Sequence, residues 1–479
     1  MQLLLADQLG PHFVKESRLL LPIVDRQFYK RNYHRQKAHL IRYAQYKRAQ
    51  DQNVELIRLD SYRDLAGHPG LNSVVHPTSR SFVELAKSLQ LELLPIEGFC
   101  SSFDDWAQHL TTTKNRLRLE EFYRFQRSRL GVLMEGNAPM GGAWNFDAEN
   151  RLPPPKTGIG AREPWVAVED EIDQRVRAEL DELERKGLAK FIGVDGPRIF
   201  PGSREEALAA LEHFISERLD LFGPYEDAVD KGDWAMAHSL LSVPINLGLL
   251  SPMEVVRKAE AAYLSGTARL ESVEGFIRQI IGWRDYVWHL YWHFGESYLD
   301  QNQLGANKPL PLSWKNLDGG GIDAKCLSHT IDQVGKHSWH HHIPRLMILG
   351  NTAIQRGYSP REVNEWFIDA FADGYQWVMP ANVIGMSLYA DGGMMSTKPY
   401  VAGGAYLKRM TNFCSDCPLN PAKRVGEDAC PFTAGYWYFL DKHRDRFRTN
   451  HRMSQAMAGL SRLSDLDQIR EQESKRESL

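Results

Sequence analysis

The chain has 479 residues, with 58 Lys and Arg against 61 Asp and Glu, which gives a formal net charge of −3. Its length predicts two to four domains, and 43% hydrophobic with 25% charged residues is typical of a soluble globular protein, not a disordered or fibrous one. The near balance of charge argues against a generic polybasic nucleic-acid binder, and five cysteines are too few for a secreted disulfide framework.

Short apolar runs alternate with helix-favouring segments over the first 130 residues. The runs at 3–5, 54–59 and 91–96 resemble strands, and a polar segment over 33–50 favours a helix. Strands that alternate with helices predict a parallel sheet of the βαβ type. No GxGxxG follows the first strand and no GxxxxGK[ST] occurs, so the usual dinucleotide and P-loop fingerprints are absent.

The remaining sequence divides into a connector and a helical region. Paired glycines at 141–142 and three prolines at 153–155 predict an irregular connector, and a charged helix follows over 168–186. From Ser203 onward the pattern is helical, without a strand series. The predicted fold class is therefore α/β plus all-α, with an α/β domain at 1–130, a linker at 131–202 and a helical domain at 203–479.

No targeting segment or membrane span is expected. Asp7 ends the N-terminal apolar run too early for a signal peptide. The longest stretch without charge, 234–253, has span length, but Pro244, Pro252 and Gly248 interrupt it. We interpret it as a buried helix pair with a turn, and we expect a cytoplasmic protein that does not enter a membrane.

Two polar segments of the helical region suggest binding chemistry. Ser239 and Ser242 precede a tight turn, where hydroxyls and free amides can hold a phosphate, although such serines also act simply as helix caps. Histidines occupy positions 337 and 340–342. On one helix His337 and His341 would share a face and could bind a metal, whereas proton transfer in a pocket or ordinary core packing explains them equally well.

Four of the five cysteines lie in the C-terminal third. Cys414, Cys417 and Cys430 form a C-x₂-C-x₁₂-C pattern, and Cys326 lies 88 positions before Cys414. Four thiolates without histidines at finger spacing suit either tetrahedral zinc or an iron–sulfur cluster. Cys100 has no partner at a useful spacing, and we expect it to be packed in a core.

Local charge departs from the global balance in two stretches. Residues 26–48 contain eight Lys and Arg and no acid, and residues 442–452 read KHRDRFRTNHR. A solvated helix face is the ordinary explanation of such runs, and a footprint for the phosphates of a nucleic acid is the alternative.

Together these segments resemble the photolyase/cryptochrome family, specifically its iron–sulfur bacterial branch of deoxyribodipyrimidine photolyase-related proteins, which includes prokaryotic (6-4) photolyases. The resemblance implies a Rossmann-like antenna domain, a long linker and a helical FAD-binding catalytic domain. The motifs that carry it are, in chain order, DQLG, EEFYRFQRSRLGVLMEGNAPMGGAWNFDAENR, HSLLSVPINLGLLSP, GWRDYVWHLYW, HHIPRLM, NEWFIDAFADGYQWV, GMSLYADGGMMSTKPY and the four cysteines.

The resemblance also implies the cofactor sites. Arg345 and Asp391 match an ion pair beside the flavin ring. The four cysteines match ligands of a 4Fe-4S cluster, and a 6,7-dimethyl-8-ribityllumazine antenna would contact Asp7, Gln8 and Leu9. The other residues matched to FAD are Tyr225, Ser239, Leu241, Ser242, Arg284, Asp373 and Asn382.

Active-site residues are implied in the same way. His341 and His342 match the histidines that donate a proton, with Tyr400 and Gln279 beside the lesion. Trp366 and Trp314 match an electron path, but Phe367 stands where relatives often carry tyrosine. Because phenylalanine is very hard to oxidise, another aromatic would be needed, and the candidates are Trp377, Tyr375 and Tyr389.

The expected function is light-driven repair of (6-4) photoproducts in UV-damaged DNA by an electron from photoexcited reduced FAD, with histidine-assisted protonation. A cryptochrome-type blue-light photoreceptor with the same cofactors is the alternative. A cluster-containing DNA-binding module without photochemistry is a third hypothesis. We expect a monomer in a bacterial cytoplasm.

Overall fold

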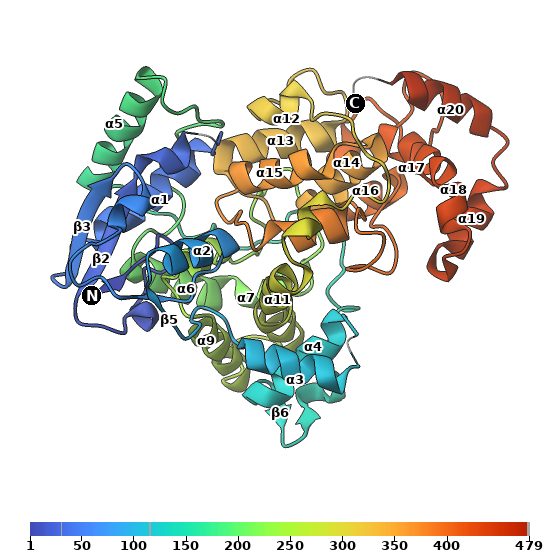
Figure 1. Cartoon of the computed structure of the whole chain (residues 1–479). Coiled ribbons are helices and arrows are strands. Elements are labelled where there is room, and N and C mark those ends of the chain that lie inside the picture. The colour runs from blue at the N-terminus through green and yellow to red at the C-terminus, as the bar shows by residue number, and fades with distance from the viewer. Residues whose placement is uncertain (30, 115, 477–479) are drawn as a thin grey trace.

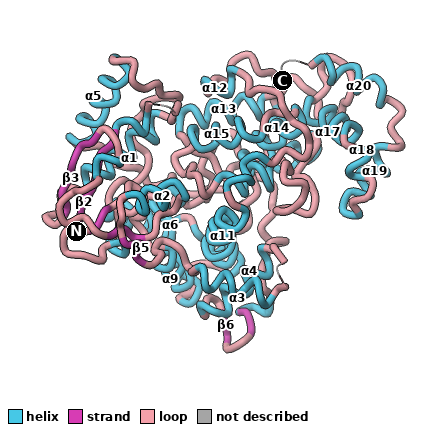
Figure 2. Tube along the Cα trace, viewed as in Figure 1, coloured by secondary structure: helices cyan, strands magenta, loops and turns pink. Residues whose placement is uncertain are grey.

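The computed structural model describes residues 1–29, 31–114 and 116–476, and it has a sheet at one end and helices elsewhere (Figures 1 and 2). All pairings in the five-stranded sheet are parallel, as the sequence predicts, and the strand order is β3-β2-β1-β4-β5. This order places β1 at the centre of the sheet, as in doubly wound α/β folds. The strands are β1 (Gln2–Leu3), β2 (Leu19–Val24), β3 (Val54–Leu59), β4 (Ser73–Val75) and β5 (Glu92–Leu94).

Strands β2 and β4 escaped the sequence prediction. Strand β2 is the longest buried strand of the sheet, yet it contains Pro22, which cannot donate a hydrogen bond to a neighbouring strand. The carbonyl of Pro22 accepts a hydrogen bond from Gln45 Nε2 (3.0 Å), so the buried backbone is satisfied by helix α1 (Arg35–Arg48).

The helices fill the rest of the chain, and the described ones are not long and apolar enough to cross a membrane. Near the sheet lie α1 and α2 (Arg80–Ser88), and a small hairpin pairs β6 (Met134–Glu135) with β7 (Ala138–Pro139). The others are α3 (Phe103–Thr112), α4 (Leu119–Leu130), α5 (Glu171–Arg185), α6 (Arg204–Glu217), α7 (Leu219–Phe222), α8 (Ser242–Asn246), α9 (Pro252–Leu264), α10 (Leu270–Ile277), α11 (Asp285–Phe294), α12 (Leu312–Asn316), α13 (Lys325–His337), α14 (Asn351–Arg356), α15 (Pro360–Ala370), α16 (Gly404–Met410), α17 (Pro431–Lys442), α18 (Arg444–Phe447), α19 (Ser454–Leu460) and α20 (Leu466–Lys475).

Helices α3 and α4 pack with the helical part of the molecule. Trp106 of α3 and Phe122 of α4 share a core with Tyr286 and Trp288 of α11, and these helices lie together at the bottom of Figure 1. The sequence analysis predicts that the α/β domain extends to residue 130 and so includes both helices. From this packing we propose that the α/β unit ends before Phe103.

The linker folds back over the α/β unit. Its helix α5 lies beside α1 (Figure 1) and pairs its acids with the basic stretch 26–48. Arg42 is fully buried and contacts Glu179 (3.0 Å), while Arg35 contacts Glu184 (2.7 Å) and Asp181. The interpretation of this stretch as a solvated face or a phosphate footprint is therefore wrong for most of its described cations, because carboxylates of the same chain pair with Arg31, Arg35, Arg42, Lys47 and Arg48; Arg26 is exposed.

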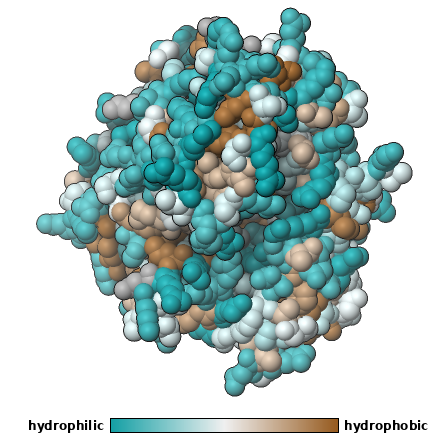
Figure 3. Space-filling model, turned by 90° about the vertical axis from the view of Figure 1, so that its right-hand side faces the viewer, coloured by the Kyte–Doolittle hydropathy of each residue, from teal (hydrophilic) through white to brown (hydrophobic). Residues whose placement is uncertain are grey.

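The uncharged stretch 234–253 does not form the predicted helix pair. It is buried, as expected, but its first part is an irregular loop, and only the short α8 and the start of α9 are helical. At the other end of the chain, α17–α20 form a lobe at the right of Figure 1, and this side is mostly hydrophilic with small, separate hydrophobic patches (Figure 3).

Three π-helical segments interrupt the helices of the large domain: η5 (Arg278–Arg284), η7 (Pro344–Gly350) and η8 (Ala381–Ser387). The wider π turn inserts an extra residue and changes the direction of side chains, and such turns are frequent at functional sites. All three segments contribute side chains to one cavity.

Candidate functional site

A cavity of about 860 Å³ lies within the helical part of the molecule. Ligand pockets have volumes of about 300–1,000 Å³, so this space suits a cofactor together with part of a substrate. The lining includes most of the predicted flavin and catalytic residues: Ser239, Leu241, Ser242, Gln279, Arg284, His341, His342, Arg345, Asp373, Trp377, Asn382 and Tyr400.

An ion pair between Arg345 and Asp373 lies in the cavity wall. The two guanidinium Nη atoms donate to the two carboxylate oxygens over 2.8 and 3.1 Å, a bidentate geometry that fixes both groups. Ser242 Oγ also donates to Asp373 (2.8 Å), and Arg345 Nε donates to the carbonyl of His340 (2.6 Å). The pair therefore joins η7 to the segment after α15, and Ser242 joins this segment to α8.

The predicted pairing of Arg345 with Asp391 is wrong. Asp391 accepts hydrogen bonds from the hydroxyl of Tyr298 (2.8 Å) and the amide of Met395 (2.9 Å), so its carboxylate closes a buried turn after η8. Tyr225 also lies outside the lining that the structure describes.

The loop before α8 has an unusual backbone. Met236 and Leu240 have φ angles of 47° and 59°, a left-handed region that residues other than glycine seldom adopt. Arg218 holds this loop, since its Nη2 donates to the carbonyls of Met236 (2.5 Å) and His238 (3.0 Å). Burial lowers the pKa of Arg218 to about 10. The presentation of His238 and Ser239 to the cavity thus depends on a buried cation.

Arg284 joins the cavity to the segment after the sheet. Its Nη1 donates to the carbonyl of Gly98 (2.7 Å), and its guanidinium lies 4.4 Å from the ring centroid of Phe99 and 5.0 Å from that of Trp377. Burial lowers the pKa of Arg284 to about 10. Asn382 donates to the carbonyl of Val378 (2.9 Å), which leaves its amide oxygen for other partners.

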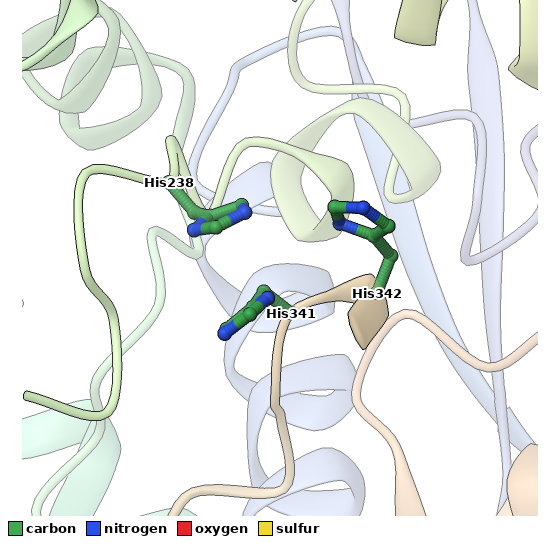
Figure 4. A group of neighbouring side chains, drawn as sticks. All are labelled: His238, His341 and His342. Atoms are coloured by element: carbon green, nitrogen blue, oxygen red, sulfur yellow. The ribbon is translucent and has the colours of Figure 1, made fainter. Parts of the chain in front are cut away.

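Three histidines gather at one side of the cavity (Figure 4). Ligand nitrogens of His238, His341 and His342 all lie within 4.8 Å of one another. The rings of His238 and His341 stack at 4.2 Å with an interplanar angle of 18°, so their in-plane lone pairs do not converge on one ion. This geometry favours proton handling over metal binding. His337 ends α13, where its ring stacks on Trp234 (4.1 Å), so the predicted pair of His337 and His341 on one helix does not form.

Opposite protonation states distinguish these histidines. Burial lowers the pKa of His238 and of His341 well below the usual range, so both rings are neutral near pH 7. Burial also acts to lower the pKa of His342, but the charge of Asp227 and its hydrogen bond with Nε2 (3.1 Å) raise it overall. His342 is therefore the cationic member of the cluster.

Two acidic residues that the sequence analysis missed, Glu226 and Asp227, line the cavity next to these histidines. Burial raises the pKa of Glu226 to about 7. Its carboxylate accepts a hydrogen bond from Gln279 Nε2 (2.8 Å) and a longer one from Asn150 (3.3 Å). Both acids directly follow Tyr225, which lies outside the described lining.

Several polar atoms of the lining lack a protein partner among the described residues. They are buried and belong to Tyr123, His238, Trp339, His341 and Ser387. Buried polar groups are normally hydrogen-bonded, so these atoms indicate a polar ligand in the cavity. A flavin has ring nitrogens, carbonyl oxygens and ribityl hydroxyls, and these groups fit such a lining.

The predicted electron path does not reach the cavity by tryptophan alone. The rings of Trp314 and Trp366 lie 4.9 Å apart and both are buried, and Phe367 lies between Trp366 and the cavity. Two other tryptophans form a separate series. Trp339 lines the cavity, and its ring lies 5.7 Å from that of the partly exposed Trp234.

Cys326, Cys414, Cys417 and Cys430 approach one another at the base of α17. Burial and the charges of the other three thiols raise the pKa of Cys326 well above the usual range. The four thiols therefore lie close enough for their charges to act on one another, as ligands of one metal group would.

The segment predicted to contact an antenna is held at the domain junction. Asp7 accepts a hydrogen bond from Thr78 (2.6 Å), and Gln8 Nε2 donates to the carbonyl of Val75 (3.0 Å). The amide of Leu9 donates to Leu247 of the helical part (3.2 Å). These contacts link the sheet to the segment that contains α8 and the loop before it.

Basic side chains line the cavity where it opens to solvent. Arg124, Arg151, Lys398 and Arg409 are all exposed, although Arg151 pairs with Asp147. The second basic run, 442–452, belongs to the α17–α19 lobe and is partly compensated, because Arg444 pairs with Asp441 (2.8 Å). A polyanion at the cavity would therefore meet the four exposed cations first.

Comparisons with known proteins agree with this arrangement. The family model for deoxyribodipyrimidine photo-lyase-related protein matches residues 3–188. A (6-4) photolyase from Agrobacterium fabrum is 40% identical over 383 residues, which cover 79% of this chain and 73% of that protein.

Two solved structures share the fold. A class III photolyase from Agrobacterium tumefaciens matches with a TM-score of 0.57 and 15% identity over 99% of this chain and 96% of its own. A cryptochrome from Synechocystis matches with a TM-score of 0.52 and 14% identity over 82% of each chain. At these identities the likeness concerns the fold alone.

Proposed function

The chain belongs to the photolyase/cryptochrome family, and on that basis we propose that it repairs (6-4) pyrimidine–pyrimidone photoproducts in DNA by light-driven electron transfer from reduced FAD. The observation that carries this proposal is the cationic His342, held by Asp227 in the wall of a flavin-sized cavity. The similar Agrobacterium protein bears the name (6-4) photolyase.

The cavity lining fits FAD. The Arg345–Asp373 pair supplies a fixed cation and a carboxylate at the ring, and Ser239, Ser242 and the constrained loop supply polar groups for the phosphates. When bound, FAD supplies the electron that light transfers to the lesion. Arg345 holds positive charge at the place where negative charge accumulates.

The histidine cluster supplies the proton that the repair reaction needs. Transfer of a hydroxyl between two pyrimidines needs a proton donor, and Asp227 raises the pKa of His342, which favours the protonated form of this ring. Glu226, with a pKa of about 7, lies close enough for its charge to act on His342, and it can return a proton after each turnover. Tyr400 and Gln279 border the same space.

A photorepair assay tests the function. The reduced, FAD-loaded chain is illuminated with an oligonucleotide that contains one (6-4) photoproduct, and intact dipyrimidine is quantified; we expect restoration under blue light and none in darkness. Lesion binding and flavin photoreduction without restored pyrimidines would contradict repair and favour a blue-light photoreceptor.

We further propose that Trp339 and Trp234, not Trp366 and Trp314, reduce the flavin in light. Phenylalanine at 367 separates Trp366 from the cavity, whereas Trp339 lines it. Trp377 also lines the cavity, but a guanidinium lies closer to its ring (Arg284, 5.0 Å) than to the ring of Trp339 (Arg345, 5.7 Å), and a nearby cation opposes oxidation. We expect Trp339→Phe to slow photoreduction by a thiol at least about tenfold, as measured by flavin absorbance. A larger loss in Trp314→Phe than in Trp339→Phe would contradict this path.

We propose the four cysteines as ligands of a 4Fe-4S cluster, because four thiolates without histidines at finger spacing suit such a cluster and the charges of the other three thiols act on Cys326. We expect Cys414→Ser to lower the iron content and to bleach cluster absorbance in the purified protein, because one of four ligands is lost. Cys100→Ser, at a buried thiol in the core near α4, is the control and leaves the iron content unchanged. Equal iron in Cys414→Ser and wild type would exclude this residue as a ligand.

A lumazine antenna in the α/β unit remains a proposal, supported by the similarity of this unit to the photolyase-related family model. We also propose that the monomer is the active form, since every side chain named above comes from one chain.

A further inference from the structure

Lys37 is a buried lysine at the junction between the α/β unit and the helical part, and none of the roles proposed above uses it. Its side chain extends from α1, and the residue is 3% exposed. Its Nζ donates hydrogen bonds to the carbonyl oxygens of Ile368 (2.5 Å) and Gly374. Burial lowers the pKa of Lys37 to about 7. A buried ammonium is unfavourable unless its hydrogen bonds are satisfied, and here backbone carbonyls satisfy them.

The two carbonyls mark the ends of the segment that carries Asp373. This segment leaves α15 and turns sharply, and Gly374 donates to the carbonyl of Phe371 (2.9 Å). A Cβ atom at Gly374 would lie 2.5 Å from the carbonyl oxygen of Phe367, so the turn is tightly packed. Between the two ends, Asp373 presents its carboxylate to Arg345 and Ser242.

Other groups of the α/β unit face the same segment. Arg31 pairs with Asp369 (2.5 Å), and the amide of His34 donates to the carbonyl of Asp369 (2.8 Å). The rings of Tyr33 and Tyr375 lie 5.0 and 5.4 Å from the ammonium of Lys37. Of the groups from the α/β unit, Lys37 bonds to the carbonyls at both ends of the segment, whereas Arg31 and His34 bond near its start, at Glu365 and Asp369. From the helical part, Ser338 bonds to Ala370 and Ala372, and Asn246 Nδ2 donates to the carbonyl of Asp373 (3.3 Å).

We propose that Lys37 is a positioning residue of the flavin site: it fixes segment 368–374 so that Asp373 keeps the orientation that pairs with Arg345 and Ser242. The inference rests on the proposed function, because it takes this ion pair as part of the FAD site. The α/β unit then completes the flavin site from outside the helical part, in addition to any role with an antenna.

The test measures FAD dissociation from the oxidised holoprotein by the recovery of free-flavin fluorescence. We expect Lys37→Met to release FAD at least about tenfold faster than wild type. If Lys37 acts through Asp373, the same substitution in an Asp373→Asn background changes the rate less than twofold, because the orientation it protects no longer matters. Gln36→Leu is the matched control: Gln36 is the neighbouring buried residue and bonds to Lys336 (2.6 Å), not to the Asp373 segment.

The outcomes separate the two claims. Additive effects of Lys37→Met and Asp373→Asn, or equal FAD loss in Gln36→Leu, would show that Lys37 only stabilises the interface and would overturn the inference. If Lys37→Met does not fold, Lys37→Gln is measured instead, alone and combined with Asp373→Asn, and the same results support or overturn the inference. If wild type binds FAD, Asp373→Asn releases FAD faster and Lys37→Met releases it at the wild-type rate, the inference about Lys37 is overturned and the proposed FAD site is not. A wild-type chain that cannot bind FAD overturns both.

Discussion

Replacement of His342 by alanine is expected to reduce photorepair of a (6-4) oligonucleotide at least about 100-fold, the usual contribution of a positioned general acid. His342 is the histidine of the cluster whose pKa is raised, while His238 and His341 are neutral through burial. The measurement is restored pyrimidine per absorbed photon, with FAD content and lesion affinity recorded in parallel. His337→Ala, which changes a histidine stacked on Trp234, is the control and should repair within twofold of wild type.

Repair should also depend on pH through Asp227. His342 must be protonated to act, so the rate falls as pH rises through its pKa. Since Asp227 raises this pKa, Asp227→Asn is expected to move the alkaline limb of the pH–rate profile to lower pH. An unchanged alkaline limb would mean that another group donates the proton. Full repair by His342→Ala would likewise mean that a group other than His342 donates the proton.

Replacement of Asp173 by alanine is expected to lower the free energy of unfolding by about 3 kcal/mol, the range found when one partner of a buried ion pair is removed. Asp173 lies at the start of α5 with its side chain fully buried, and it accepts hydrogen bonds from His39 Nε2 and Arg198 Nε, both at 2.8 Å. Without this carboxylate, the buried Arg198 retains only Glu206 as an acidic partner (2.9 Å).

Chemical denaturation provides the measurement for Asp173→Ala. Although burial opposes it, hydrogen bonds from His39 and Arg198 lower the pKa of Asp173 below its usual range. The carboxylate therefore stabilises the fold fully above about pH 4 and loses its effect as pH falls, so the variant should differ less from wild type in acid. Glu182→Gln changes an exposed pair on the same helix and should leave the free energy of unfolding close to that of wild type. A similar loss in both variants would contradict the assignment of a buried network.

Much of the architecture could be predicted from the sequence because it depends on local pattern. The alternation of apolar runs with helix-favouring segments predicts the parallel sheet, and ordered motifs such as HSLLSVPINLGLLSP indicate the family. Local pattern failed where the local signal was ambiguous. Pro22 is unfavourable inside a strand, so the central strand β2 was not predicted. The first part of the uncharged stretch 234–253 is a loop held by Arg218, where a helix was predicted.

The partners of charged residues were decided only by the tertiary structure. The sequence shows a run of eight cations at 26–48, but not that Arg35 and Arg42 of this run pair with acids of α5. From the sequence, either Asp373 or Asp391 could pair with Arg345. In the structure Arg345 pairs with Asp373, because the segment after α15 lies against η7, whereas Asp391 closes a turn elsewhere. The net charge of −3 likewise conceals exposed cations at one cavity. Residue types and spacing determined the family and the candidate ligands, whereas the pairing of charges far apart in the chain depends on packing that no local pattern records.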